Sequence, residues 1–322
     1  MGQPVGERAD EGTILHCAVC GADDAEAVHP GLPLVRCRRC GLGYLDPQPS
    51  DEALASLYAD DYYTRPIDPG GPSYLKNRAG LERFFDGRLA RIERCIRVGR
   101  LLDVGAGLGY FLNAAIRRGW SAVGLEVSPF AARYAREQFG LDVRQQTLEE
   151  ADLPEAPFDA VVMRDVLEHA RDPRRFLTQA RRVLRPAGLL ALSVPNFASL
   201  DARLGGPRWR HLRPEQHLYH FTPATLGRLL ADCGFRDVER ESRYDSPATR
   251  EVYASLADPA ARRRLAWHAA LRGDIVFLPL GSSLRRVLRA LALVFSCIAR
   301  PFRGRLQDDI LETLALNSEA IP

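Results

Sequence analysis

The sequence predicts an α/β protein built on a doubly wound parallel sheet, with a small four-cysteine module in front of it. Three observations lead to this prediction. Short apolar runs alternate with helical patterns from residue 100 onward, a glycine-dense turn follows the first run, and two C-x-x-C-G motifs stand near the N-terminus. Alternation of this kind builds right-handed βαβ units and hence a parallel sheet.

The bulk composition is that of an ordinary globular protein. Of the 322 residues, 46% are apolar and 26% are charged, and the net charge is +3. The arginines are interspersed with acids, which argues against nucleic acid as a partner. The N-terminal stretch lacks a basic segment followed by an apolar one, and no run of about 18 apolar residues occurs, so we expect a cytoplasmic protein.

Four of the seven cysteines form two matching knuckles. Cys17 and Cys20 belong to the first, Cys37 and Cys40 to the second, and 16 residues separate the two C-x-x-C motifs. This is the spacing of a zinc ribbon, in which four thiolates close a tetrahedron around a structural Zn²⁺. Because the loop between the knuckles is acidic and would repel phosphate, we interpret residues 1–46 as a docking or scaffold module.

The next segment, residues 47–98, is expected to form a helical linker and lid. Residues 51–58 carry a cap, early acids and apolar spacing suited to a helix. Tyr58, Tyr62 and Tyr63 then fall within six residues of one another.

A glycine-dense turn follows the apolar strand expected at 100–104. Gly105, Gly107 and Gly109 allow the backbone to take a positive φ and to approach a ligand closely. A dinucleotide fingerprint would need a third glycine where Tyr110 stands, although an NAD- or nucleotide-sugar-binding domain remains the alternative.

An acid stands at the end of each of the first two apolar runs. Asp103 precedes the first glycine of the turn, and Glu126 ends the following run, 23 residues further on. A carboxylate at the second position suits hydrogen bonds to ribose hydroxyls and would repel a 2′-phosphate. The two acids therefore indicate a nucleoside-like ligand.

This arrangement of acids and glycines resembles class I S-adenosylmethionine (SAM) methyltransferases. With the ribbon, the Pro-x-Pro turn and the tyrosine-rich turn, residues 14 to about 240 are similar to a small-molecule subfamily of the methyltransferase-23 type found in sugar and natural-product pathways. The resemblance implies a Rossmann-like seven-stranded sheet and SAM as cofactor. The residues it places at the cofactor are Asp103, Gly105, Ala106, Gly107, Gly109, Glu126, Val127, Gln146, Thr147, Leu148, Arg164 and Asp165.

Ligands of such sheets bind at the C-terminal edge of the strands. Residues 146–148 should flank the adenine there, and Arg164 and Asp165 should border the cofactor. The Asn/Asp-Pro-Pro-aromatic turn typical of enzymes that methylate DNA adenine or protein glutamine is absent after the fourth strand. Residues 99–244 are thus expected to form the SAM-binding core, with further strands at 121–126, 141–145, 158–163 and 188–194.

Three histidines crowd into residues 209–221, where a substrate lid belongs. His217 and His220 are the candidate catalytic bases, because a spacing of three places them on one side of a helix and a pKa near neutrality suits this work. Packing of the lid is the alternative for each. Tyr219 is a lesser candidate, and His169 is expected to line the pocket or to hold a neighbouring loop.

Thr222 is expected to cap a helix that runs to Cys233 and is followed by a strand at 235–244. The last strand, 310–316, should pair antiparallel within residues 308–322. Residues 245–307 between them are too long for a hairpin loop and are interpreted as a helical insertion. Its stretch 282–305 combines an apolar stripe with arginines, which suits peripheral membrane contact, and packing against the domain or in a homodimer is the alternative.

The sequence therefore predicts a SAM-dependent methyltransferase with a small-molecule acceptor. O-methylation of a sugar, glycoside or polyketide-like acceptor is expected first and C-methylation of a nucleotide-linked sugar second. The alternative of another class is a non-catalytic, SAM-binding zinc-ribbon adaptor.

Overall fold

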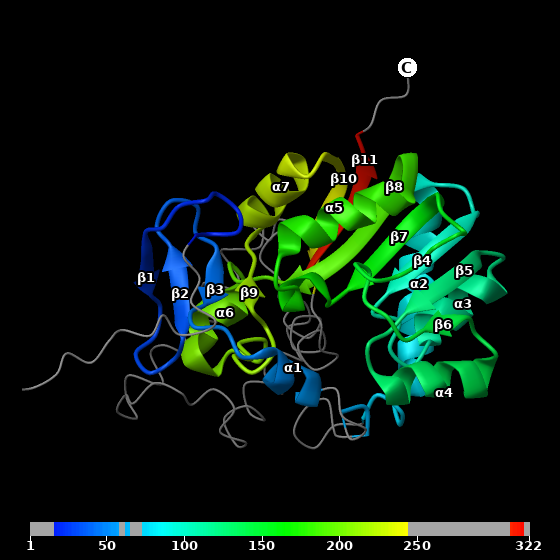
Figure 1. Cartoon of the computed structure of the whole chain (residues 1–322), viewed down its shortest axis with the longest axis horizontal. Helices are drawn as coiled ribbons and strands as arrows, with labels where there is room; N and C mark the ends of the chain where they lie inside the picture. The colour runs from blue at the N-terminus through cyan, green and yellow to red at the C-terminus, as the bar shows by residue number, and fades with distance from the viewer. Residues whose placement is uncertain (1–15, 58–61, 65–72, 244–309, 319–322) are drawn as a thin grey trace, which may run out of the picture.

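The computed structural model describes four stretches of the chain, residues 16–57, 62–64, 73–243 and 310–318 (Figure 1). The expected insertion at 245–307, with its amphipathic stretch, lies outside the described residues, and so does Tyr58. Among the helices that are described, none is long and apolar enough to cross a membrane.

The described part of the chain contains a seven-stranded sheet in the order β10-β11-β8-β7-β4-β5-β6. The strands from β4 to β8 run parallel, whereas β11 pairs antiparallel with both β8 and β10. The strand order reverses beside β4, which is where ligands of open α/β sheets bind. The strands are β4 (Arg100–Val104), β5 (Ser121–Leu125), β6 (Val143–Arg144), β7 (Phe158–Arg164), β8 (Leu184–Pro195), β10 (Phe235–Arg243) and β11 (Ile310–Asn317).

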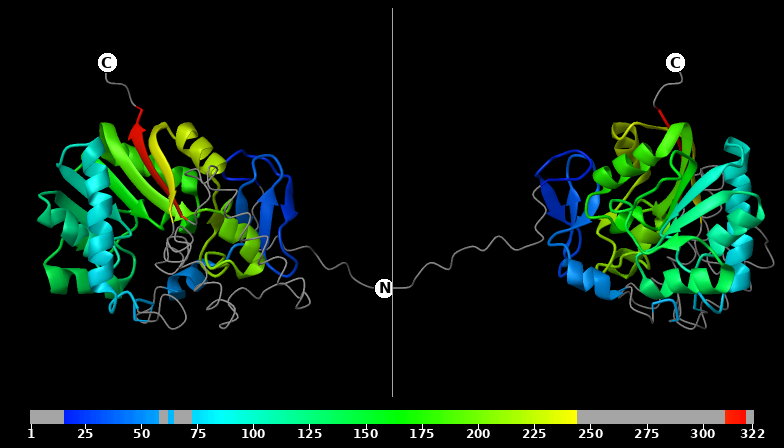
Figure 2. Two further views of the ribbon diagram at one scale, coloured as in Figure 1. Left: turned by 180° about the vertical axis from the view of Figure 1, so that it is seen from behind. Right: turned by 45° about the vertical axis from the view of Figure 1, so that its right-hand side comes forward.

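The helices cover both faces of this sheet (Figure 2). Successive strand residues point to opposite faces, so Val161 belongs to the core under α5 and α7, whereas Val162 belongs to the core under α2, α3 and α4. The predicted doubly wound architecture is confirmed. The helices are α1 (Asp51–Leu57), α2 (Arg78–Cys95), α3 (Tyr110–Arg117), α4 (Pro129–Phe139), η1 (Leu167–His169), α5 (Pro173–Val183), α6 (Leu200–Gly205), η2 (Gly206–Arg208) and α7 (Pro223–Asp232).

Local capping explains where α7 begins. The Thr225 backbone N–H donates to Thr222 Oγ1 over 3.2 Å, and the Thr222 N–H donates to Thr225 Oγ1 over 2.8 Å. This reciprocal pair satisfies two N–H groups at the helix start, and Pro223 occupies the first helical turn, where no N–H is needed. The predicted cap is confirmed.

The four-cysteine segment forms a second sheet with the order β1-β2-β3-β9. Its last strand comes from the far half of the chain: Gly43 of β3 pairs with His220, and Tyr44 pairs with Tyr219. Both views place this sheet beside α6 (Figures 1 and 2). The strands are β1 (Ala25–Ala27), β2 (Leu34–Cys37), β3 (Gly43–Leu45) and β9 (Tyr219–His220).

The cysteine segment and the large sheet share one hydrophobic core. Val19 and Leu34 of the cysteine segment belong to the same cluster as Val161 of β7 and Leu229 of α7. Arg174 of α5 adds a polar contact, since its guanidinium donates to the Val19 carbonyl over 3.1 Å. The small sheet is therefore an integral layer of the molecule.

Candidate functional site

The turn after β4 is shaped by three glycines in the left-handed region. The φ angles of Gly105, Gly107 and Gly109 are 72°, 54° and 79°. The backbone N–H groups of Gly105 and Ala106 both donate to the Leu125 carbonyl, over 2.8 and 2.9 Å. The turn is thereby fastened to the end of β5.

The three glycines have different roles. A Cβ on Gly105 would lie 2.5 Å from Val166 Cγ2, and one on Gly109 would lie 2.7 Å from Leu141 Cδ1. Only the Cβ direction of Gly107 is open, with Tyr63 at 3.7 Å. Gly109 does not line the cavity at this turn but allows α3 to pack closely against Leu141 and Ala135, and its predicted cofactor contact stays a prediction.

Alanine at Gly109 should therefore destabilise the protein more than alanine at Gly107. Both substitutions force a left-handed backbone onto a residue with a Cβ, at about 1–2 kcal/mol, but Gly109→Ala adds an overpacking cost of about 1–3 kcal/mol. We expect urea unfolding to show a loss of at least about 2 kcal/mol for Gly109→Ala and a smaller one for Gly107→Ala. Equal losses would contradict the packing role.

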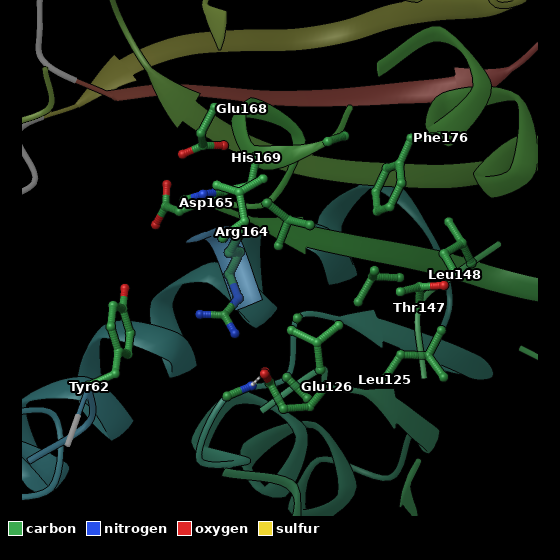
Figure 3. Close-up of a pocket in the computed structure, with 18 of the residues that line it drawn as sticks. Tyr62, Leu125, Glu126, Thr147, Leu148, Arg164, Asp165, Glu168, His169 and Phe176 are labelled. Atoms are coloured by element: carbon green, nitrogen blue, oxygen red, sulfur yellow. Dashed lines mark hydrogen bonds between the residues drawn. The ribbon is translucent and has the colours of Figure 1, made fainter. Parts of the chain in front are cut away.

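Glu126 braces the turn from the end of β5. Its Oε2 accepts from the Gly107 N–H over 2.6 Å, and its Oε1 accepts from the Ser128 N–H over 2.8 Å (Figure 3). Burial raises the pKa of this carboxyl. A carboxylate offers about four acceptor sites, and the Val127 N–H and the Tyr63 side chain also act on this one, so a ligand hydroxyl would compete with Tyr63.

A cavity of about 900 Å³ opens at this turn, within the size range of small-molecule sites. The predicted adenine-flanking residues 146–148 line it, as do Tyr62, Tyr63 and Tyr74 from the segment before β4. The predicted cofactor residues found in its lining are Gly105, Ala106, Gly107, Glu126, Val127, Gln146, Thr147, Leu148, Arg164 and Asp165.

Asp103 is the other predicted cofactor residue that lies outside this lining. Its side chain is wholly buried, and burial raises its pKa to about 6. The nearest charge is Arg164, whose Nη2 lies 3.8 Å from Asp103 Oδ1 and whose guanidinium stacks over Phe85 and Phe111, 4.2 and 4.6 Å from the ring centroids. Asp103 therefore lies behind Arg164, which itself lines the cavity, and a direct contact of Asp103 with a cofactor stays a prediction.

The opposite side of the cavity carries histidines. His217 lines it, and its Nδ1 lies 2.7 Å from the His211 carbonyl oxygen. The His169 ring meets it edge-on, with the centroids 4.8 Å apart, and His169 Nδ1 lies 2.9 Å from the Gln216 carbonyl oxygen. Burial lowers the pKa of His169 to about 4 and that of His217 well below its usual range.

His220 does not reach this cavity. Residues 217–218 are irregular and 219–220 form β9, so the expected helix is absent here, although the rings of His217 and His220 lie 6.3 Å apart between centroids. His220 is 1% exposed, and its ring lies 5.4 Å from Phe197 and 6.1 Å from Trp209 between centroids. Tyr219 is also outside the lining. The burial of His220 favours the alternative, packing within the small sheet, and its role as a base stays a prediction.

The burial of His220 predicts an acid-sensitive fold. Burial, and secondarily the nearby His211, lowers the pKa of His220 from 6.5 to about 3. Below pH 6.5 the unfolded chain binds a proton at this histidine and the folded chain does not. The free energy of unfolding is therefore highest above pH 6.5 and falls as the pH decreases toward 3.

Between pH 7 and pH 5, wild type should lose about 2 kcal/mol of unfolding free energy relative to His220→Phe, which cannot take up that proton. Denaturant unfolding of both proteins at the two pH values measures this difference. An unchanged gap would contradict the buried, neutral state of His220.

Glu168, His211 and Arg213 also line the histidine side of the cavity, and sequence reasoning did not select them. Glu168 is wholly buried. The sequence signal that could have identified Glu168 is its position directly before His169, in the segment that follows the fourth strand. His211 and Arg213 stand in the histidine-rich segment, but spacing alone could not distinguish cavity-facing residues from core residues there.

The four cysteines come together as predicted. Cys17 Sγ lies 3.4 Å from Cys40 Sγ, Cys20 Sγ lies 3.5 Å from Cys37 Sγ, and all four sulfurs lie within 4.8 Å of one another. Gly21 and Gly41 close the two knuckles with left-handed turns, and their N–H groups donate to the carbonyls of Cys17 and Cys37. Bonds of about 2.3 Å to a tetrahedral Zn²⁺ place thiolates at about 3.8 Å from one another, so this set fits the ion.

Several proteins named as methyltransferases are similar in sequence to this chain. A "Probable S-adenosylmethionine-dependent methyltransferase" of Mycobacterium tuberculosis is 30% identical over 54% of this chain and 65% of its own length. A "Ubiquinone biosynthesis O-methyltransferase" of Cereibacter sphaeroides is 33% identical over 47% of this chain and 65% of its own. One of Bradyrhizobium is 34% identical over 56% of this chain and 74% of its own.

The chain thus spans slightly less than two thirds of the first two relatives' length. The family model described as methyltransferase domain (Methyltransf_23) matches residues 74–240, which is more than half of the chain and includes the glycine turn, Glu126 and the histidine side of the cavity. The chain belongs to this family of methyltransferase domains.

Proposed function

We propose that the protein transfers a methyl group from SAM to a hydroxyl oxygen of a small molecule, such as a sugar, a glycoside or a polyketide-like compound. One observation carries the proposal. A single cavity joins the glycine turn and Glu126 at one end to Glu168, His169 and His217 at the other. A cofactor and a small acceptor can meet in it, and its volume of about 900 Å³ suits small partners better than a macromolecule.

The residues at the turn fit a SAM molecule. Glu126 would accept from ribose hydroxyls in competition with the Tyr63 side chain, and the open side of Gly107 allows close approach of the ligand to the backbone. Residues 146–148 line the place expected for the adenine, and Arg164 and Asp165 border the cavity at the end of β7. SAM would supply the reactive methyl group, so these residues have mainly to bind and to orient it.

The acceptor would lie on the histidine side. His217 is the one predicted base that reaches the cavity, and its Nδ1 is engaged with a backbone carbonyl, so Nε2 is the atom that acts on the acceptor hydroxyl. The relatives named as O-methyltransferases favour oxygen over carbon as the methylated atom. C-methylation of a nucleotide-linked sugar is the second candidate.

We also propose that Cys17, Cys20, Cys37 and Cys40 hold a structural Zn²⁺. The close approach of the four sulfurs and the turn geometry of both knuckles support it. Four protein ligands leave no open position for chemistry, so this ion would act on stability.

The transfer can be tested with SAM that carries an isotope-labelled methyl group. The full chain is incubated with a panel of hydroxylated sugars, glycosides and phenols, and the products are examined by NMR. We expect a labelled O-methyl signal that His217→Gln strongly reduces. A labelled C-methyl product would favour the second candidate, and SAM binding without turnover on any acceptor class would favour a non-catalytic adaptor.

A further inference from the structure

Three potential metal ligands gather on the histidine side of the cavity. Glu168 and His169 are neighbours in η1, and His217 precedes β9. One ligand atom from each lies within 4.8 Å of the other two. Among the described residues, the four cysteines form the other such group. The two groups differ in chemistry, since this one offers two imidazoles and a carboxylate in place of four thiolates.

Both imidazoles are held in the orientation that metal ligands adopt. His169 Nδ1 faces the Gln216 carbonyl at 2.9 Å, and His217 Nδ1 faces the His211 carbonyl at 2.7 Å. A carbonyl only accepts, so each Nδ1 carries the proton and each Nε2 keeps its lone pair. Histidines that bind metals are oriented in this way by a backbone carbonyl or a carboxylate at the other ring nitrogen.

Glu168, which supplies the carboxylate, is buried, and its backbone is held in place. Glu168 is wholly buried, its carbonyl accepts from the Leu218 N–H over 2.8 Å, and the His169 N–H donates to the Val166 carbonyl over 3.0 Å. A buried carboxylate needs positive charge beside it. Arg213 lines the same side of the cavity, and Asp165 adds a second negative charge there.

We propose that Glu168, His169 and His217 bind a divalent transition-metal cation on the acceptor side of the cavity. Two imidazoles and one carboxylate suit Zn²⁺, Fe²⁺ or Co²⁺ better than Mg²⁺ or Ca²⁺, and three protein ligands leave positions open for exogenous oxygens. Glu168, His169 and Asp165 lie together across the cavity from Glu126, with Arg164 between (Figure 3).

Glu168, His169 and His217 line the same cavity as Glu126 and the glycine turn. This part of the inference rests on the proposed function and replaces one role in it: His217 Nε2 would hold the cation instead of serving as the free base, and the cation would supply an acidifying effect on the hydroxyl of an acceptor with two adjacent oxygens.

Calorimetric titration with Co²⁺ tests the site on full chain that holds one equivalent of Zn²⁺, the amount the four cysteines would bind. We expect one equivalent to bind while the zinc content stays unchanged. His217→Gln and Glu168→Gln should each weaken cobalt binding by at least about 10-fold, because losing even a group that orients a ligand costs that much. His29→Gln, which removes a histidine outside the cavity lining, is the matched control and should bind as wild type does.

Cobalt binding that is absent in wild type, or equal in wild type and both ligand variants, would overturn the site. S-adenosylhomocysteine titrated into the same samples separates the two proposals. If that compound binds and cobalt does not, the metal site fails and the methyltransferase stands; the reverse result keeps the site and removes the function. Binding of S-adenosylhomocysteine also shows that each variant is folded. If Glu168→Gln does not fold, the cobalt affinity of His217→Gln alone decides whether the metal site exists.

Discussion

Replacing Cys37 and Cys40 together with serine should abolish zinc binding and lower the unfolding free energy of the whole protein by at least about 3 kcal/mol, which corresponds to a Tm about 6–12 °C lower. The reason is that a sheet this small would depend on the proposed Zn²⁺ for its folding energy. Its residues Val19 and Leu34 lie in the same core as β7 and α7, so losing the small sheet exposes both.

Zinc content and differential scanning calorimetry measure this effect. Cys95→Ser is the matched control, because Cys95 is exposed and lies outside the four-cysteine group. A double variant that keeps the Tm and the zinc content of Cys95→Ser would show that the cysteines hold no structural ion.

Glu126→Ala should weaken binding of S-adenosylhomocysteine by at least about 100-fold. The substitution would remove the two proposed charge-assisted hydrogen bonds to the ribose, each worth about 1.5–3 kcal/mol. It also frees the Gly107 N–H that the carboxylate holds at 2.6 Å. Glu126→Gln keeps the size and one acceptor oxygen and should bind with intermediate affinity. An alanine variant that binds within a few-fold of wild type would contradict the ribose contact.

Much of the fold could be predicted because its signals are local. Apolar runs of strand length set β4, β5 and β7 to within one or two residues, since buried parallel strands are continuous apolar stretches. The start of α7 at Thr222 and Pro223 followed from side-chain capping, which needs no tertiary contact.

The arrangement of the histidines could not be predicted, because it depends on contacts between distant segments. β9 is two residues long and exists as a strand only through its pairing with Gly43 and Tyr44, which no local pattern encodes. That pairing buries His220 and leaves His217 facing the cavity.

Asp103 and Gly109 illustrate a second limit. Both belong to the glycine-rich motif that begins at the end of β4. A motif gives the spacing of its residues along the chain, but it does not tell how deeply each side chain is buried in the fold. Asp103 lies wholly buried behind Arg164, and Gly109 faces Leu141 and Ala135, so both support the cavity from outside its lining.

The central claim is that the glycine turn and Glu126 bind SAM rather than a dinucleotide, and calorimetric titration of the purified full chain tests it most directly. S-adenosylhomocysteine and NADH are titrated separately into the same zinc-assayed sample. We expect saturable binding of S-adenosylhomocysteine at one molecule per chain and no binding of NADH. Binding of NADH without binding of S-adenosylhomocysteine would contradict the account.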